Sequence, residues 1–165
     1  MKNIHISAFI FFAILFVACE KTDNENTPEI PQDLIDKSLN YFDGVVIQEN
    51  LKIEEGLESW EIKIQNSKGS IVNFYWTVIS VSLLKIEGLT GPFDYEIQPE
   101  RNLINFSTAK TVAMGALKNE AIEKWELEQE EDFIDKWIYT FEFHDDGGSR
   151  KVYIDAKSGD ILQID

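Results

Sequence analysis

The sequence is poor in the residues that most often build catalytic and metal centres. Among its 165 residues it has one cysteine, Cys19, and two histidines, His5 and His144. A single cysteine excludes an internal disulfide and a zinc site made of cysteines. With so few imidazoles, chemistry that needs two histidines is nearly excluded as well. Paired carboxylates acting on glycosides are the alternative in so acidic a chain, but nothing singles out a pair. We therefore expect no catalytic residues, no metal site and no cofactor.

Positive charge is also scarce. The chain has 15 Lys and Arg residues against 30 Asp and Glu residues, which gives a net charge of −15. Proteins that bind nucleic acids cluster Lys and Arg against the phosphates, so this chain is not expected to bind nucleic acid. At 44% hydrophobic and 27% charged residues, the composition is that of a folded domain rather than of a disordered chain.

The only long apolar run lies at the N-terminus. It extends from Ile4 to Val17, follows Lys2 and ends before the charged residues that begin at Glu20. It is shorter than the ~20 residues that a membrane-spanning helix needs. A basic start, a short apolar stretch and a small residue before a cleavage point are typical of a signal peptide. The alternative is a short membrane anchor.

The end of this run resembles the lipobox of bacterial lipoproteins. The residues are Phe16-Val17-Ala18-Cys19, with Phe16 where the family usually has leucine. In that family the cysteine is lipidated and becomes the first residue of the mature chain. The resemblance implies a signal peptide over 1–18, lipidation of Cys19 and a tether over 19–29. We therefore expect the protein in the cell envelope, lipid-anchored to a membrane and facing the periplasm or the cell surface.

Four patterns recur in the same order 77 or 78 residues apart. They are the helix-like residues Leu34, Ile35, Ser38, Leu39 and Val112, Ala113, Ala116, Leu117; Trp60 and Trp137; Phe74-Tyr75-Trp76 and Val152-Tyr153-Ile154; and 83–87 and 161–165. Repetition in one order indicates an internal duplication. We predict an α+β fold of two tandem α-β-β-β-β units, each with one helix packed on an antiparallel sheet. The first unit is expected at 30–88, a connector at 89–102 and the second unit at 103–165.

Alternating apolar and polar residues predict most of the strands, since one face of each strand is buried. Strands are expected near 45–53, 60–65, 71–77, 83–87, 122–130, 137–144, 150–156 and 161–165. The first helix is expected to begin near Pro31 and to end before Gly44. In the second helix, Ser107 or Thr108 is expected to cap the N-terminus.

The second unit resembles a PepSY domain. The resemblance is carried by 107–117, by 137–143 and above all by 152–161, with its Tyr-x-Asp-Ala-x-x-Gly-x-Ile ending. The first unit is similar to a PepSY-like variant, but it has Thr-Val-Ile-Ser-Val-Ser at 77–82 in place of Asp-Ala-Lys-Ser-Gly-Asp. The resemblance implies a fold related to that of a β-lactamase inhibitor. It also implies a non-catalytic role, because such domains occur in peptidase propeptides and are proposed to restrain peptidases near the cell surface.

Tyr75 and Tyr153 occupy matching positions in the two units. Both point away from the apolar neighbours expected to pack under the helices, so they are expected on the helix-free sheet face, near Lys63 and Thr140. Aromatic residues on an open sheet are natural anchors for a partner. We therefore predict partner binding by Tyr75, Tyr153, Lys63 and Thr140. The alternative is that the two units pack on each other through this face.

Three other groups of residues have a simpler structural interpretation. His144, Asp145, Asp146 and Ser149 crowd onto one hairpin, whereas a Ser/His/Asp site needs groups brought together from a distance. Asp155, Ser158 and Asp160 are typical of a turn, with calcium binding as the alternative. The acidic run from Glu126 to Asp135 is expected to be a solvated strand face and loop, or else a patch for a cation or a basic partner.

These observations predict a non-catalytic envelope lipoprotein, not an enzyme. It is expected to bind, and to inhibit or regulate, an unidentified secreted or surface protein such as a peptidase, while touching the membrane only through its lipid anchor. The alternative is a small-ligand carrier or small hydrolase of the cell envelope. That alternative needs a deep pocket with converging polar groups.

Overall fold

The computed structural model describes residues 29–54, 56–98, 102–118, 121–129, 136–145 and 148–165. Cys19, the expected signal peptide and most of the expected tether lie outside these residues. The helices are α1 (Gln32–Tyr41) and α2 (Phe106–Ala116). The strands are β1 (Val45–Glu54), β2 (Leu57–Gln65), β3 (Ile71–Thr77), β4 (Leu83–Thr90), β5 (Ala121–Gln129), β6 (Trp137–Asp145), β7 (Gly148–Asp155) and β8 (Ile161–Ile164).

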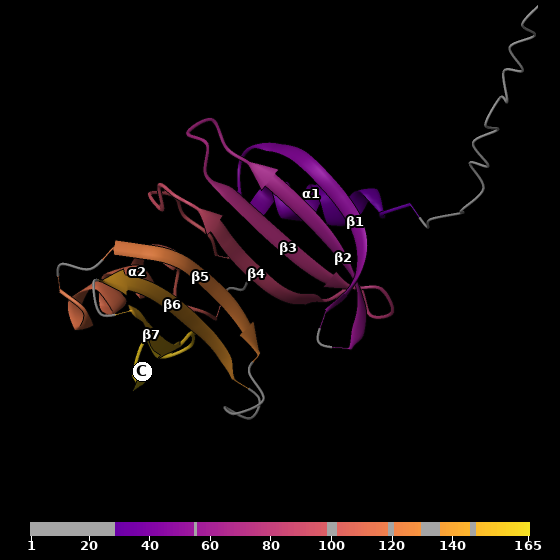
Figure 1. The fold of residues 1–165 in the computed structure, drawn as a ribbon. Helices are drawn as coiled ribbons and strands as arrows, with labels where there is room; N and C mark the ends of the chain where they lie inside the picture. Colours follow the sequence, from indigo (N-terminus) through magenta and orange to yellow (C-terminus); the bar gives the residue numbers. More distant parts are fainter. Residues whose placement is uncertain (1–28, 55, 99–101, 119–120, 130–135, 146–147) are drawn as a thin grey trace, which may run out of the picture.

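The strands form one antiparallel sheet in which each strand lies beside the next one along the chain, from β1 to β8. Both helices cover the same face of this sheet (Figure 1). The α+β class with antiparallel strands is therefore confirmed. None of the helices in the described part of the chain is long and apolar enough to cross a membrane.

The first four strands join the last four edge to edge. β4 pairs with β5 from Lys85 opposite Glu128 to Gly88 opposite Trp125. The helix-free face is therefore continuous across all eight strands. The alternative that this face is buried by packing of 30–88 on 103–165 is wrong, because β4 and β5 pair along their edges within one sheet.

Helix α1 is held by apolar packing and by one buried hydrogen-bond chain. Leu34 is fully buried against the sheet. The hydroxyl of the buried Ser38 donates to the Leu34 carbonyl at 2.9 Å and accepts from the Trp76 indole at 3.0 Å. Phe42 ends the helix, and Gly44 lies so close to β2 that a Cβ there would meet the Gln65 carbonyl oxygen at 2.5 Å. The expected helix bounds are confirmed.

Helix α2 begins one residue before the expected caps. Asn105 is the N-cap, and its side-chain oxygen accepts from the Thr108 backbone N–H at 3.0 Å. Ser107 and Thr108 already belong to the first turn, so the prediction that one of them caps the helix is wrong. The small residues Ala109 and Ala113 are fully buried, which lets the helix approach β6 and β7 closely.

The core lies between the helices and the sheet and is rich in aromatic rings. Near the junction of β4 and β5, Tyr95 stacks on Phe106, and Phe106 lies 4.5 Å from Trp125 between ring centroids. The Trp125 indole donates to the Tyr95 hydroxyl at 2.8 Å. Gly88 makes room for this ring, because a Cβ at 88 would lie only 1.9 Å from the Trp125 Nε1. The junction is thus part of the core rather than a hinge.

Strand pairing corrects one correspondence between the two halves. Trp60 lies opposite Trp76, whereas Ile154, the counterpart of Trp76, lies opposite Tyr139. Tyr139, not Trp137, therefore occupies the place of Trp60. The predicted correspondence of Trp60 with Trp137 is therefore wrong by two residues, because the β6–β7 hairpin is one residue shorter than the β2–β3 hairpin between these paired positions.

Candidate partner-binding face

The four residues predicted to bind a partner all lie on the helix-free face of the sheet. Strand pairing places three of them in one row that crosses the sheet in the order Lys63, Asn73, Glu87, Glu126, Thr140, Tyr153, Gln163. Tyr75 belongs to the neighbouring row, between Glu61 and Lys85. At ~4.8 Å between strands, Lys63 and Tyr153 are about 24 Å apart, so these residues form an extended surface rather than a compact site.

Tyr75 is buried and does not present its ring to solvent. Its exposed fraction is 4%. Its hydroxyl donates to Glu87 Oε2 at 3.0 Å and lies 3.3 Å from Glu61 Oε1, and the Lys85 ammonium lies 5.0 Å from the ring centroid. Burial and the charge of Glu87 raise the pKa of Tyr75 well above its usual value, so it stays a neutral donor. The expectation of an open aromatic anchor is therefore wrong at this position.

Glu61 is a buried carboxylate with a complete set of partners. It is 1% exposed, accepts from Lys52 Nζ at 2.7 Å and accepts from Asn50 Nδ2 at 2.8 Å. Burial opposes its ionisation, but the bonds from Lys52 and Asn50 outweigh burial and hold the pKa of Glu61 below its ordinary value. Glu61 is therefore a fixed negative charge at neutral pH.

A second set of ion pairs lies over β4 and β5. Lys124 Nζ contacts Glu87 Oε1 at 2.6 Å and Glu126 Oε1 at 2.8 Å, while Lys85 Nζ lies 4.0 Å from Glu128 Oε2. Burial opposes the ionisation of Glu87, but Lys124 outweighs it, and the pKa of Glu87 is lowered. Burial would likewise lower the pKa of Lys124, yet Glu126 and Glu87 raise it above its usual value. Both partners therefore keep their charges.

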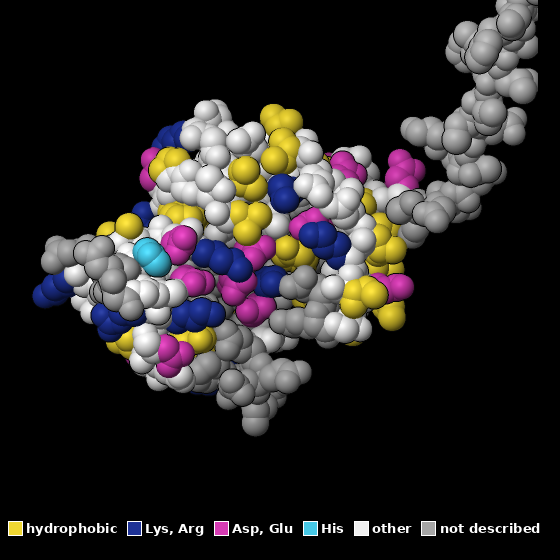
Figure 2. Space-filling model, viewed as in Figure 1, with side chains coloured by type: hydrophobic (Ala, Val, Ile, Leu, Met, Phe, Trp, Pro, Cys, Tyr) yellow, Lys and Arg dark blue, Asp and Glu magenta, His cyan; other side chains and the backbone are white. Residues whose placement is uncertain are grey.

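The network is balanced in charge although the whole chain is strongly acidic. Three lysines contact its four glutamates, and the charge of a fourth, Lys63, acts on Glu61 two positions away in β2. The residues are Glu61, Glu87, Glu126, Glu128, Lys52, Lys63, Lys85 and Lys124. Figure 2 shows basic and acidic side chains gathered at the centre of this face. Glu126 is half-buried and Glu128 is buried. The expectation of a solvated acidic strand is therefore wrong for these two residues. Residues 130–135 lie outside the described part of the chain.

Of the other residues predicted to bind a partner, Thr140 is buried, whereas Tyr153 and Lys63 are half-buried. Tyr153 is half-buried and lies directly opposite the buried Thr140, and Lys63 is half-buried with its ammonium donating to Gln48 Oε1 at 3.1 Å. Lys63 and Tyr153 are thus the two predicted residues with surface available to a partner. Asn73, which is buried between Lys63 and Glu87, was not predicted to lie in this row. Polar residues at every second position of successive strands could have indicated its place on the helix-free face.

The residues considered for catalysis do not converge. The side chain of His144 is 65% exposed, with Nδ1 4.0 Å from Glu123 Oε2. The Ser149 hydroxyl is hydrogen-bonded to Glu142 rather than to the histidine. Asp146 lies outside the described residues. This arrangement supports an exposed hairpin histidine with no positioned nucleophile.

The aspartates considered for calcium are engaged by the turn itself. Asp155 Oδ1 accepts from the backbone N–H of Lys157 at 2.8 Å and of Ser158 at 3.1 Å. The Ser158 hydroxyl donates to Asp160 Oδ2 at 2.8 Å, and Lys136 Nζ pairs with Asp155 Oδ2 at 3.0 Å. These bonds support the interpretation of a structural turn. No cluster of metal-ligating side chains occurs among the described residues.

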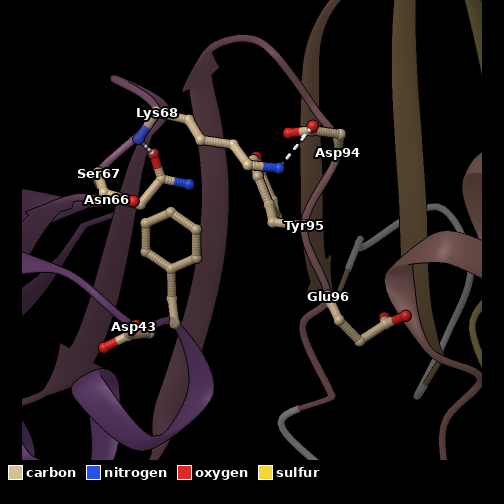
Figure 3. Close-up of a pocket in the computed structure, with 8 residues that line it drawn as sticks. Asp43, Asn66, Ser67, Lys68, Asp94, Tyr95 and Glu96 are labelled. Atoms are coloured by element: carbon tan, nitrogen blue, oxygen red, sulfur yellow. Dashed lines mark hydrogen bonds and ion pairs between the residues drawn. The ribbon is translucent and has the colours of Figure 1, made fainter.

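A small groove lies between the β2–β3 turn and the segment that leads to α2 (Figure 3). Lys68 reaches from the turn to Asp94 with Nζ–Oδ2 at 2.7 Å, and Glu96 points away toward α2, where it accepts from the Ser107 N–H at 3.3 Å. The groove has a volume of about 200 Å³, below the range typical of small-molecule pockets. Its lining is Phe42, Asp43, Asn66, Ser67, Lys68, Asp94, Tyr95 and Glu96.

Comparison with known proteins gives a family match for residues 103–165. No curated protein matches the chain. Among solved structures, a candidate lipoprotein from Clostridium difficile 630 is similar at 12% identity with a TM-score of 0.38, over 81% of this chain and 90% of that one. Residues 103–165 match the family model of PepSY, the peptidase propeptide and YPEB domain. The predicted PepSY resemblance is therefore confirmed for the part of the chain that contains α2 and β5–β8.

Proposed function

We propose that the protein is a non-catalytic binding module of the cell envelope that regulates a secreted or surface protein such as a peptidase. The observation that carries this proposal is the match of 103–165 to a family described by its peptidase propeptides. The charge network supports it, because side chains that are already fixed lose little conformational freedom when a partner binds.

The helix-free face is the surface we assign to this partner. It offers the half-buried Lys63 and Tyr153 at its two ends, with the ion pairs of β4 and β5 between them. Because charges of both signs alternate there, the matching partner surface carries complementary charges of both signs rather than a purely basic patch. Such a surface specifies orientation more than it adds raw affinity.

The two-unit organisation also belongs to this proposal. Each helix is followed by four strands in the chain order, and we propose that 30–88 and 103–165 arose by duplication, joined by 89–102. The β3–β4 and β7–β8 turns support it, because they make equivalent backbone hydrogen bonds from Thr77 to Ser82 and from Asp155 to Asp160.

We further propose that Cys19 is lipidated and anchors the mature chain. The lipobox-like residues before it support this proposal. Changing Cys19 to Ser should leave uncleaved precursor and abolish labelling by a radioactive fatty acid. Unchanged labelling would show that the anchor lies elsewhere.

The test of function is capture of a partner by a variant that lacks both half-buried residues at the ends of the face. We expect the double variant Lys63→Ala/Tyr153→Ala to recover at least tenfold less of a crosslinked envelope partner than the native protein, with unchanged thermal unfolding. Lys157→Ala, an exposed residue in the β7–β8 turn, is the matched control. The native protein should also cleave no peptide or ester substrate. Equal capture by all three proteins, or turnover that is lost with His144→Ala, would overturn the proposal in favour of a different surface or of a small hydrolase.

A further inference from the structure

Two turns have the same backbone but different side chains. In the β3–β4 turn the Thr77 N–H donates to the Ser82 carbonyl and the Val81 N–H to the Thr77 carbonyl, at 2.9 and 3.1 Å. In the β7–β8 turn the Asp155 N–H donates to the Asp160 carbonyl at 2.9 Å and the Gly159 N–H donates to the Asp155 carbonyl at 2.8 Å. Val81 therefore takes the place of Gly159, and both have a positive φ, 55° and 81°.

Charged side chains of one turn are replaced by uncharged ones in the other. Hydroxyls of Thr77, Ser80 and Ser82 bond to one another at 2.5 to 3.0 Å where the β7–β8 turn has Asp155, Ser158 and Asp160. Ile79 stands where Lys157 is and is 97% exposed. No residue from 69 to 84 is charged. The exposed part of this run is the turn itself, 79–82, with the sequence Ile-Ser-Val-Ser.

The conformation of Val81 adds to the contrast. A β-branched residue in the left-handed region is strained by ~1–2 kcal/mol, whereas glycine adopts the same φ freely. Gly159 shows that glycine suffices for this turn. The shape of the turn therefore does not explain the valine, which is a second exposed apolar residue in the same turn as Ile79. Strain of this kind is concentrated at functional sites.

A hollow of about 430 Å³ lies between this turn and the start of β2. Its lining, called here the tip pocket, is Gly56, Leu57, Glu58, Thr77, Ile79 and Ser80. Leu57 is half-exposed, and Glu58 is exposed and is the only charged residue of the lining. Within the described part of the chain, no lysine, arginine or histidine forms an ion pair with Glu58. The pocket therefore offers apolar surface beside an available carboxylate.

We propose that the tip pocket binds a protein segment that presents an apolar side chain next to a lysine or arginine. The apolar side chain would pack between Leu57 and Ile79, and the cation would meet Glu58. The proposal deepens the proposed function, on which it rests, by stating the chemistry of the partner. The net charge of −15 also draws basic segments toward the protein.

Charge argues against the other occupants of such a surface. A second copy of the chain related by a twofold axis would bring one Glu58 toward the other and add another charge of −15. A bilayer with anionic headgroups would be repelled by the same charge. A basic and apolar protein segment is complementary to both features of the pocket.

The test is an NMR titration of the ¹⁵N-labelled protein with two peptides, acetyl-Leu-Lys-Leu-Lys-amide and acetyl-Leu-Glu-Leu-Glu-amide. We expect the basic peptide to shift the amide signals of Leu57, Glu58, Ile79 and Ser80 with saturation, and the acidic peptide to bind at least tenfold more weakly. Glu58→Gln should weaken the basic peptide three- to tenfold, and Ile79→Ser should weaken both peptides. Lys157→Ala, in the equivalent turn, should change neither affinity.

Besides failure of the basic peptide to bind, three results would overturn the inference. These are equal binding of the two peptides, shifts confined to other residues, or shifts at the tip pocket that depend on protein concentration without peptide, as self-association produces. The variant Lys63→Ala/Tyr153→Ala should bind the basic peptide normally. If the peptide fails while that double variant still loses its envelope partner, the tip pocket is wrong and the proposed function stands.

Discussion

At the scale of single residues, Gly88 decides how closely β4 and β5 approach each other. A methyl group at this position would overlap the Trp125 ring and displace its hydrogen bond to Tyr95. We expect Gly88→Ala to lower the free energy of unfolding by about 1–3 kcal/mol, because overpacking forces neighbouring side chains out of their rotamers. Urea unfolding followed by circular dichroism measures the change.

Gly115 supplies the matched control for that substitution. It lies in α2, and a Cβ there would meet no atom within 4 Å. Gly115→Ala should stabilise the protein by about 0.5–1 kcal/mol through helix propensity. If both variants changed the free energy of unfolding in the same direction, the close fit of Trp125 over Gly88 would not be what determines the effect of Gly88→Ala.

Tyr75 shows how a buried hydroxyl stabilises buried charges. Tyr75→Phe removes the donor to Glu87, and we expect a loss of about 1.5–3 kcal/mol at pH 7, the range for hydrogen bonds to charged groups. The folded-state pKa values of Glu61 and Glu87 lie below 4.5, so their stabilising contribution is present above pH ~4.5 and is lost as pH falls through the lower folded values. The effect of Tyr75→Phe should therefore shrink between pH 7 and pH 3.

Denaturant titrations at the two pH values test this expectation. Asp94→Asn is the control, because it breaks an ion pair whose two side chains are about half exposed and screened by water, so it should leave stability nearly unchanged. A Tyr75→Phe effect that is the same at both pH values would mean that Glu87 does not respond to the tyrosine.

The sequence predicts which face these residues occupy but not how they are buried. The alternation around Tyr75 and Tyr153 places both on the helix-free face, as the structure shows. The burial of Glu61 and Glu87 depends on partners such as Lys52 and Lys124 from neighbouring strands. Which lysine meets which glutamate depends on strand register, which alternation does not specify.

At the scale of elements, the two equivalent turns allow an exchange of residues. We expect Val81→Gly to stabilise the protein by up to about 1 kcal/mol, because relief of left-handed strain exceeds the entropy that glycine adds to the unfolded chain. Gly159→Val should destabilise it by at least ~1 kcal/mol for the opposite reason. Melting temperatures of the two variants, compared with the native protein, give both signs in one experiment.

A destabilising Val81→Gly would show that the valine packs more favourably than its exposure suggests. A neutral Gly159→Val would show that the β7–β8 turn can change its conformation. Either result would break the equivalence of the two turns.

Elements with a clear period were predictable, whereas their ends were less so. The alternating residues of β2 and β6 gave their strands, and Pro31 and Gly44 gave the ends of α1. The start of α2 was missed because Asn105, Ser107 and Thr108 are all good caps, and sequence does not rank them. The actual cap is the residue whose backbone is still extended, at φ −75° and ψ 161°.

At the scale of the whole molecule, the joining of the two halves was not predictable from sequence. Repeats about 78 residues apart indicate two similar units, but units can meet by faces or by edges. Pairing of β4 with β5 makes one sheet, and the rings of Tyr95, Phe106 and Trp125 fill the junction from the segment before α2, from α2 and from β5. The segment 89–102 was expected only to link the two halves of the chain, but through Tyr95 it also contributes to the core.

Because the core continues through this junction, we expect the described domain to unfold in one cooperative transition. Trp60 is buried in the first half, and Trp60→Ala should cost about 3–5 kcal/mol, whereas the half-buried Trp137 should cost less. If unfolding is cooperative, Trp60→Ala should speed hydrogen exchange of the slowest β7 amides by the same free energy as those of β3. Protection of β7 that is unchanged by Trp60→Ala, or two separate melting transitions, would mean that the halves are independent domains joined only by strand pairing. Cooperative unfolding is the result that fits the proposed partner surface. That surface must hold Lys63 and Tyr153 at a fixed separation of about 24 Å if one rigid partner is to contact both.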